Sequence, residues 1–212
     1  MPDLRLFHAP NACSLASAIA LAESGLPHHV TSIDLQGDRT DYRRIVPSGR
    51  VPALLIDEEL LVESPAILLR IAALAPDAAL APTDAAAASQ LLSFLCWCAS
   101  SVHIARRRFK RPHHFTADVA AQAAISRDAR GAVEDNLVAL DARVARHAWM
   151  AGDAFTVADA YALVFFGWAL IDAFDLSHLP NLDRWAAAMT ARPATRRALD
   201  ADASPVVAYY GR

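Results

Sequence analysis

Residues 7–16 read F-H-A-P-N-A-C-S-L-A and mark a change from one kind of secondary structure to another. The apolar residues of Leu4–His8 predict a strand, and the Ala- and Leu-rich residues 14–24 predict a helix that ends at a glycine. The small, turn-rich junction between them carries a thiol, Cys13, and a hydroxyl, Ser14. This strand–turn–helix unit predicts that the chain opens with an α/β domain.

The next fifty residues continue the pattern in shorter segments. β-branched and apolar runs predict strands at 29–33, 51–56 and 59–62, and charged or Pro-led segments predict helices at 41–45 and 66–73. The order βαβ followed by ββα predicts a mixed sheet. We therefore assign residues 1–75 to one α/β domain.

Strand patterns stop after residue 84. Residues 76–84 contain two prolines and little periodicity, which is typical of a linker. The remaining residues, 85–212, predict an all-helical domain. The helices of this domain are predicted at 85–111, 117–147, 157–173, 181–191 and 194–199, and the C-terminal tail has no assignment. In the second of these helices one buried stripe is predicted, formed by Val133, Leu137, Leu140 and Val144.

The composition is that of a soluble globular protein. The 212 residues are 55% hydrophobic and 20% charged, and the net charge of −3 gives no basis for binding nucleic acid. Three cysteines cannot build a disulfide framework, which fits a reducing compartment. The N-terminus lacks a signal-peptide pattern, and no apolar stretch reaches the roughly 18 residues expected of a membrane span. We therefore expect a cytoplasmic protein without a membrane segment.

The position of Cys13 and Ser14 is suited to a catalytic role. Free backbone N–H groups and the macrodipole at a helix N-terminus favour a thiolate, so we expect the pKa of Cys13 to lie below the free value of about 8.5. The alternative is structural, with Ser14 capping the helix and Cys13 packing as a small apolar residue.

Two further positions suit a small zwitterionic peptide. A cis bond at Val51-Pro52 would turn the backbone of Val51 outward to pair with an extended peptide, although a trans proline is the commoner form. Glu63 and Ser64 precede Pro65 at a predicted helix start, where a carboxylate can be bound and the Glu63 side chain can meet an ammonium. A simple helix cap is the alternative.

Two features of the helical half have structural explanations. Thr156 and Asp159 have the spacing of a capping box, with Asp in the usual place of Glu. Cys96 and Cys98 have no third or fourth ligand nearby, so they do not predict a metal site, and we expect them to pack in the interior.

Four segments together resemble the glutathione S-transferases, and the bacterial beta class most closely. They are P-N-A-C-S-L-A-S-A-I-A-L, P-S-G-R-V-P-A-L, E-S-P-A-I and F-T-V-A-D-A, at residues 10–21, 47–54, 63–67 and 155–160. The resemblance implies a thioredoxin-like N-terminal domain that binds glutathione and an all-α C-terminal domain. It also implies a cytoplasmic, homodimeric glutathione transferase with a role in detoxification. Its co-substrate would be glutathione and its second substrate a small hydrophobic electrophile, with no metal and no nucleic acid or membrane partner.

The resemblance also assigns site residues. It implies catalytic roles for Cys13 and Ser14, and glutathione-binding roles for Val51 ahead of a cis Pro52 and for Glu63, Ser64 and His103. A candidate second-substrate pocket comprises His8, Asn11, Arg107, Phe109 and Arg111. The sequence departs from the family at Phe7, where many members have Tyr, at Asn11, where the beta class has Gly, and at Ile104, where a Lys is expected.

Several alternatives stay open at this point. Cys13 forms a mixed disulfide with glutathione, or together with Ser14 it donates a hydrogen bond that keeps the glutathione sulfur ionised. The basic residues Arg106–Arg111 form a solvated helix end, bind an anionic electrophile or contact a partner subunit. The protein as a whole is a transferase, a glutathione-dependent isomerase, dehalogenase or disulfide reductase, or a non-catalytic binding protein.

Overall fold

The N-terminal domain is built on a four-stranded mixed sheet, in a computed structural model that describes residues 2–211. The strands are arranged in the order β2-β1-β3-β4, and they are β1 (Leu4–His8), β2 (His29–Ser32), β3 (Ala53–Ile56) and β4 (Glu59–Val62). β1 is parallel to β2 and antiparallel to β3, and β4 lies antiparallel beside β3. The parallel pair requires a crossover, which helix α1 (Leu15–Ser24) supplies. The predicted βαβ-ββα order is confirmed.

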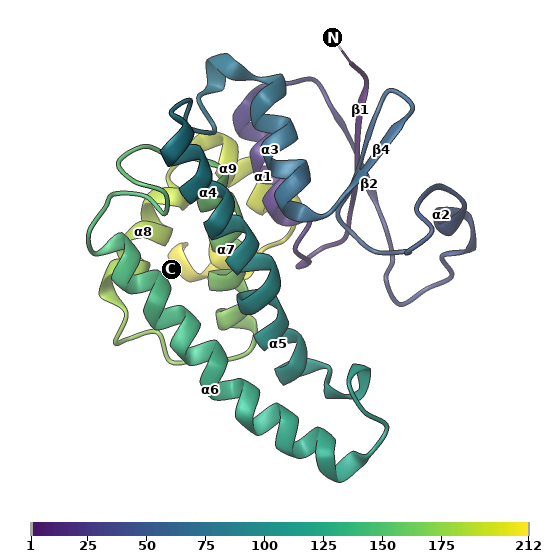
Figure 1. The fold of residues 1–212 in the computed structure, drawn as a ribbon, viewed down its shortest axis with the longest axis vertical. Coiled ribbons are helices and arrows are strands. Elements are labelled where there is room, and N and C mark those ends of the chain that lie inside the picture. Colours follow the sequence, from purple (N-terminus) through teal and green to yellow (C-terminus); the bar gives the residue numbers. More distant parts are fainter. Residues whose placement is uncertain (1, 212) are drawn as a thin grey trace.

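The alternation of side chains along β1 gives the sheet two different faces. Leu4 and Leu6 join the core that includes α1 and α3 (Ser64–Leu74). Phe7 belongs to a separate cluster, and its ring lies 5.3 Å from that of Tyr42 in α2 (Thr40–Ile45). In Figure 1, α1 and α3 lie between the sheet and the helical domain, whereas α2 lies beyond the sheet.

The C-terminal domain is all helical, as predicted. A short 3-10 turn at Pro76–Ala78 precedes it, and a second one at Pro112–His114 lies between two of its helices. The helices are α4 (Ala85–Trp97), α5 (His103–Lys110), α6 (Val119–Val144), α7 (Val157–Ile171), α8 (Pro180–Thr190), α9 (Pro193–Ala201) and α10 (Pro205–Tyr210). Helix α7 is its centre, because all of its residues from Val157 to Ala169 are buried. A helix that is apolar all round can be stable only when other elements surround it, and α7 packs against α1 of the first domain as well.

The start of α7 is held by the predicted capping box. The Thr156 hydroxyl accepts from the N–H of Ala158, and the Asp159 carboxylate accepts from the N–H of Thr156 at 2.9 Å. Asp159 also accepts from the N–H of Met150 and from the indole of Trp185, at 2.8 and 2.9 Å. Burial raises the pKa of Asp159 to about 6, despite these donors.

Helices α4 and α5 form one continuous helix with a π-helical turn, Cys98–Val102, between them. The combined segment Ala85–Lys110 has 26 residues and is long and apolar enough to cross a membrane by length and composition alone. The core helix of a soluble protein passes the same test, and Leu91, Phe94 and Leu95 of this segment are buried in the hydrophobic core. Only 28% of its most apolar window is buried, so packing accounts for part of the segment, and the expectation that no stretch has the length of a membrane span was wrong.

Four local expectations were wrong or incomplete. The tail without an assignment forms α10, and the turn at Cys98–Val102 interrupts the regular α-helix predicted there. Of the predicted stripe on α6, Leu137, Leu140 and Val144 are buried, whereas Val133 is only partly so. Cys98 is buried as expected, but Cys96 is exposed, because residues two apart on a helix point in different directions.

Candidate active site

A tight turn connects β1 to α1 and presents Cys13 on the side of the sheet that faces the helical domain. The N–H of Ala12 donates to the carbonyl of Ala9 at 3.1 Å, and Asn11 adopts a left-handed conformation with φ of 57°. Asn tolerates this region better than most residues, so the turn keeps its shape without the glycine of the beta class.

Cys13 lies at the end of this turn and is 9% exposed. Its Sγ donates to the backbone carbonyl of Val51 at 3.4 Å. Burial raises the pKa of Cys13 to about 11, although backbone N–H groups and the Ser64 hydroxyl act in the opposite direction. The expectation of a thiolate was therefore wrong: the loss of hydration outweighs the helix N-terminus, and Cys13 is protonated at neutral pH.

The Val51-Pro52 bond is cis, as the resemblance implied and against the commoner trans form. Pro52 is buried, and Ala53 directly after it begins β3. Within residues 2–211 no hydrogen-bond partner contacts the N–H of Val51, while its carbonyl receives the Cys13 thiol. The backbone of Val51 therefore offers one free donor and one exchangeable acceptor beside the thiol.

Glu63 and Ser64 form the start of α3 next to the same thiol. Glu63 is exposed and has a φ of 70°, a left-handed conformation that is uncommon for a residue other than glycine. Such strain persists where the surrounding structure requires it, often at ligand sites. Ser64 is buried, and both residues act on the pKa of Cys13, Ser64 through its hydroxyl and Glu63 through its charge. The structure thus brings Cys13, Val51, Glu63 and Ser64 together.

Ser14 points away from this group. Its side chain is fully buried and makes no cap hydrogen bond, so it does not cap α1 in the expected manner. The Ser14 hydroxyl lies 2.9 Å from Nδ1 of His8 and accepts from the N–H of Ala9 at 3.1 Å. It therefore contacts the interior of the turn rather than the surface beside the Cys13 thiol.

His8 continues this interior chain to the end of the protein. Its Nε2 lies 3.0 Å from Oδ1 of Asp202, which also accepts from the N–H of Asn11 at 3.1 Å. Oδ2 of Asp202 is buried and has no hydrogen-bond partner in the described part of the chain. The carboxylate that follows α9 thus supports the Cys13 turn, and His8 is occupied inside the protein rather than in a second-substrate pocket.

His103 lies on the other side of the Cys13 turn. Its ring packs edge-on against Trp168 of α7 at 5.0 Å, and the Trp168 indole donates to the carbonyl of Asn11 at 2.8 Å. Burial and the charges of Arg106 and Arg107 lower the pKa of His103 to about 4, so this side chain is neutral at physiological pH. His103 is therefore connected to the Cys13 turn through Trp168.

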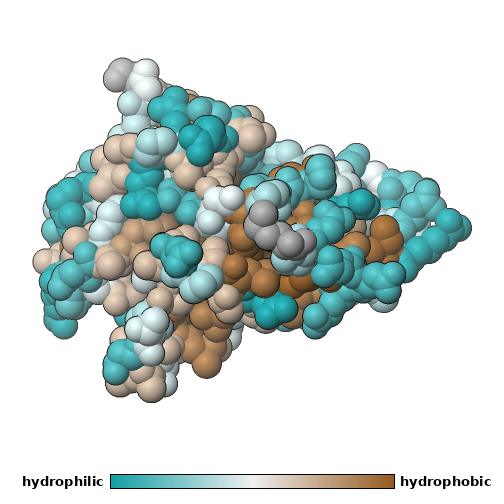
Figure 2. Space-filling view, turned by 90° about the horizontal axis from the view of Figure 1, so that it is seen from above, coloured by the Kyte–Doolittle hydropathy of each residue, from teal (hydrophilic) through white to brown (hydrophobic). Residues whose placement is uncertain are grey.

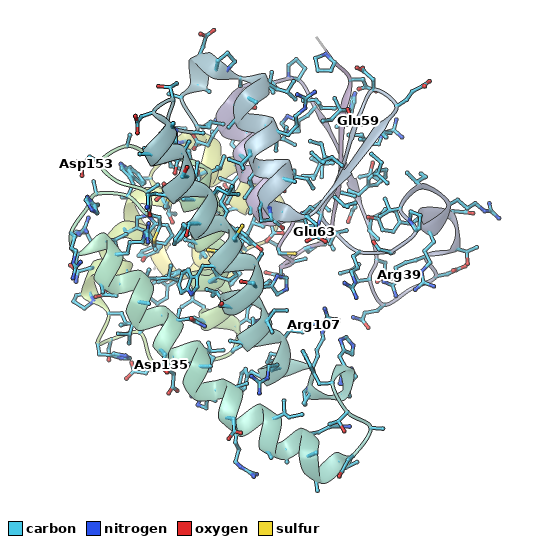
Figure 3. The ribbon with its side chains drawn as sticks, viewed as in Figure 1. Arg39, Glu59, Glu63, Arg107, Asp135 and Asp153 are labelled. Carbon is cyan, nitrogen blue, oxygen red and sulfur yellow. The ribbon has the colours of Figure 1, made fainter. Side chains whose placement is uncertain are left out.

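The remaining candidate pocket residues lie along α5 and do not form one pocket with His8 and Asn11. Phe109 packs against Phe174, at 5.5 Å between ring centroids, toward the interior of the helical domain. Arg107 lies 3.3 Å from the ring of His114, and Arg111 is exposed at the end of α5. Figure 3 shows Arg107 on α5 and Glu63 at the start of α3, both bordering the space between α5 and the sheet domain.

Comparison with known proteins identifies the family to which the chain belongs. Residues 13–79 match the family profile of the glutathione S-transferase N-terminal domain, and residues 98–193 match that of the glutathione S-transferase C-terminal domain. The chain belongs to the glutathione S-transferase family.

Individual relatives agree over nearly the whole length. The chain is 32% identical to glutathione S-transferase GstA of Escherichia coli O157:H7, covering 94% of this chain and 98% of the relative. It is 37% identical to the structure of a sphingomonad glutathione S-transferase complexed with glutathione, with a TM-score of 0.82 and coverage of 94% and 98%. A beta class glutathione S-transferase from Sphingomonas chungbukensis is 38% identical, with a TM-score of 0.81 and coverage of 93% and 98%. The resemblance seen in the sequence is confirmed.

One departure from other glutathione transferases has a structural explanation. Phe7 replaces the expected Tyr, but its side chain packs with Tyr42 on the sheet face opposite to Cys13. The residue of β1 on the Cys13 side is His8, which the Asp202 carboxylate holds. Neither residue therefore places a phenol beside Cys13.

Sequence reasoning missed two residues of the site. Tyr161 of α7 is buried, and its pKa is raised chiefly by burial and by the nearby Cys13, whereas the Ser64 hydroxyl acts in the opposite direction. Its only signal in the sequence was a place on an apolar helix, where a tyrosine needs a partner for its hydroxyl. Asp202 had no signal, because it lies 191 residues from Asn11, its partner in the turn.

Proposed function

We propose that the protein is a glutathione transferase that activates the glutathione thiol for attack on a small hydrophobic electrophile. The observation that carries the proposal is the meeting of three groups at one surface: the Cys13 thiol, the backbone of Val51 and the start of α3 at Glu63 and Ser64. Family membership supports it, as do related structures that contain glutathione.

The cysteinyl unit and the γ-glutamyl end of glutathione each have matching groups. The free N–H and the carbonyl of Val51 suit the backbone of the cysteinyl unit, which has one acceptor and one donor. The Ser64 hydroxyl and the unpaired N–H groups at the start of α3 suit the γ-glutamyl carboxylate. The Glu63 carboxylate suits the ammonium of the same unit. A peptide bound in this way would extend its thiol toward Cys13.

The protonation state of Cys13 favours a donor role over a mixed disulfide. A thiol with a pKa of about 11 is almost entirely protonated at neutral pH, so it is a poor nucleophile and an available S–H donor. When the cysteinyl N–H of glutathione donates to the Val51 carbonyl, it replaces the Cys13 S–H there, and the Cys13 S–H is free to donate to the glutathione sulfur. The thiolate then forms a C–S bond, the leaving group departs with its electron pair, and the thiol proton goes to solvent. Ser14 acts indirectly here, by holding the turn through His8.

A homodimer in the cytoplasm is the setting we propose for detoxification of electrophiles. Val62 of β4 and Leu92 of α4 are 40% and 46% exposed, large fractions for apolar side chains. In Figure 2 apolar side chains reach the surface in the middle of the view, whereas the right-hand end, which carries α2, is mostly hydrophilic. A second copy of the chain would cover such apolar surface.

Calorimetric titration of glutathione tests the binding site directly. Replacing Ser64 by Ala removes a donor to a carboxylate, and hydrogen bonds to charged groups contribute about 1.5–3 kcal/mol, so we expect affinity to fall roughly tenfold or more. Ser89→Ala is the matched control, because the Ser89 hydroxyl is exposed and bonds only to the carbonyl of Ala85 in its own helix. Equal affinity in the Ser64 variant and the control would remove Ser64 from the site.

A further inference from the structure

Four of the five basic residues at 106–111 form two pairs that the sequence did not distinguish, and the fifth, Arg108, has no acidic partner among residues 2–211. Arg106 and Lys110, one turn apart, both contact Asp172, at 2.7 and 3.2 Å, and the Arg106 guanidinium also lies 4.3 Å from the centre of the Trp168 ring. Both cations are therefore paired with one carboxylate within the helical domain. Arg107 and Arg111, also one turn apart, lie on a different stripe of the helix and have no acidic partner among residues 2–211.

Two imidazoles and a further arginine lie around this second stripe: Arg107 is 3.3 Å from Nδ1 of His114, and the His114 ring is 4.4 Å from that of His113. Loss of hydration and neighbouring positive charges lower the pKa of His114, and those charges belong to His113, Arg107, Arg111 and Arg50. Arg50 is a residue of the sheet domain, directly before the Val51 backbone that borders Cys13. The group therefore has members in both domains. We call Arg50, Arg107, Arg111, His113 and His114 the cationic rim.

The cationic rim is continuous with the thiol site. The Asn11 carbonyl in the Cys13 turn receives the Trp168 indole, Trp168 packs against His103, and Arg107 follows His103 one helical turn, about 5 Å, further along α5. Figure 3 shows Arg107 and Arg39 approaching the same space from α5 and from the segment before α2. An electrophile in the space between α5 and the sheet domain, which Arg107 and Glu63 border in Figure 3, would thus lie beside Arg107.

We propose that the second substrate is an electrophile that carries an anionic group, a carboxylate or similar acid, and that Arg107 and Arg111 recognise it. This proposal rests on the transferase function proposed above. A cluster of positive charges without acidic partners raises the local concentration of anions and orients them. Guanidinium groups also match the geometry of a carboxylate better than ammonium groups do.

A pair of electrophiles that differ by one carboxylate tests the proposal. Chlorodinitrobenzene and chlorodinitrobenzoate undergo the same reaction: the glutathione sulfur bonds to the ring carbon, and chloride leaves with the electron pair. Dividing each kcat/KM by the uncatalysed rate with glutathione removes the intrinsic difference in reactivity. We expect the normalised value to be higher for the benzoate, and the advantage to shrink as salt screens the charges.

The variants Arg107→Gln and Arg107→Gln/Arg111→Gln locate the effect. We expect the benzoate-to-benzene ratio of kcat/KM to fall about tenfold in the double variant, through a higher KM for the benzoate. Arg108→Gln is the matched control, since Arg108 lies on the same helix outside this stripe, and its ratio should equal that of the wild type. Size-exclusion chromatography accompanies each variant, with the dimeric fraction as its readout.

Each contrary outcome is distinct. An unchanged ratio in the double variant, or no preference for the benzoate in the wild type, would overturn the proposal. A rise in KM for glutathione alone would assign the rim to a glutathione carboxylate, and loss of the dimer would assign it to the subunit contact. Both results also overturn it. If the wild type binds no glutathione and turns over neither electrophile, the transferase function itself fails.

Discussion

The reactivity of Cys13 gives the sharpest prediction, because burial and helix position act on it in opposite directions. With a pKa of about 11 in place of the usual value of about 8.5, the thiolate fraction at about pH 7.5 falls roughly 300-fold. The limited exposure of Sγ, 9% for the residue, slows attack further. A thiolate of higher pKa is about 10–18 times more nucleophilic, which offsets part of this loss, so iodoacetamide should alkylate Cys13 at least about 15 times more slowly than an ordinary exposed cysteine.

Peptide mass spectrometry over a time course measures this rate with internal references. Cys96 is exposed and serves as the reactive standard, while Cys98 is buried, with its pKa raised by burial, and should react least. The Cys13 rate should rise with each unit of pH until about pH 11, because the thiolate fraction rises tenfold per unit below the pKa. Alkylation of Cys13 within about tenfold of Cys96 at neutral pH would refute the reasoning and restore thiol exchange as its role.

Two further predictions concern carboxylates that hold the fold around the site. Asp159→Ala leaves three buried donors without an acceptor, so we expect about 3 kcal/mol or more of lost stability in urea unfolding; the exposed Asp153→Ala should change little. Asp202→Ala removes the acceptor of Asn11 N–H and His8, so we expect about 2–3 kcal/mol of lost stability and a lower kcat. The exposed Asp200→Ala is its control, and equal melting temperatures for the two variants would contradict this role.

The sequence predicted the elements whose signals are local. The strand at Leu4–His8, the helix that follows it and the capping box at Thr156 each depend on residues within a few positions of one another, and all three are present. The C-terminal helix α10 was missed although Ser204-Pro205 begins it, because six residues carry too little periodicity.

The site itself was predicted only in part, because its chemistry depends on contacts across the fold. The helix N-terminus correctly located Cys13, but burial in the folded chain raises its pKa, and its Sγ donates to the carbonyl of Val51, 38 residues away. Ser14 has the residue type and the position of a helix cap, yet its hydroxyl lies against Nδ1 of His8. The His8 ring is held there by the Asp202 carboxylate. Neither Asp202 nor Tyr161 lies near the turn in the sequence.

The most direct test of the account is the ionisation of glutathione when it is bound. Thiolate absorbs in the ultraviolet, so difference spectra of the saturated complex over a pH series give the apparent pKa of the bound thiol, in the wild type and in Cys13→Ala. In the wild type we predict an apparent pKa below that of an unperturbed cysteine thiol, which is about 8.5. In the variant we predict a return toward that value. An identical apparent pKa in both proteins would contradict the claim that the Cys13 S–H stabilises the glutathione thiolate.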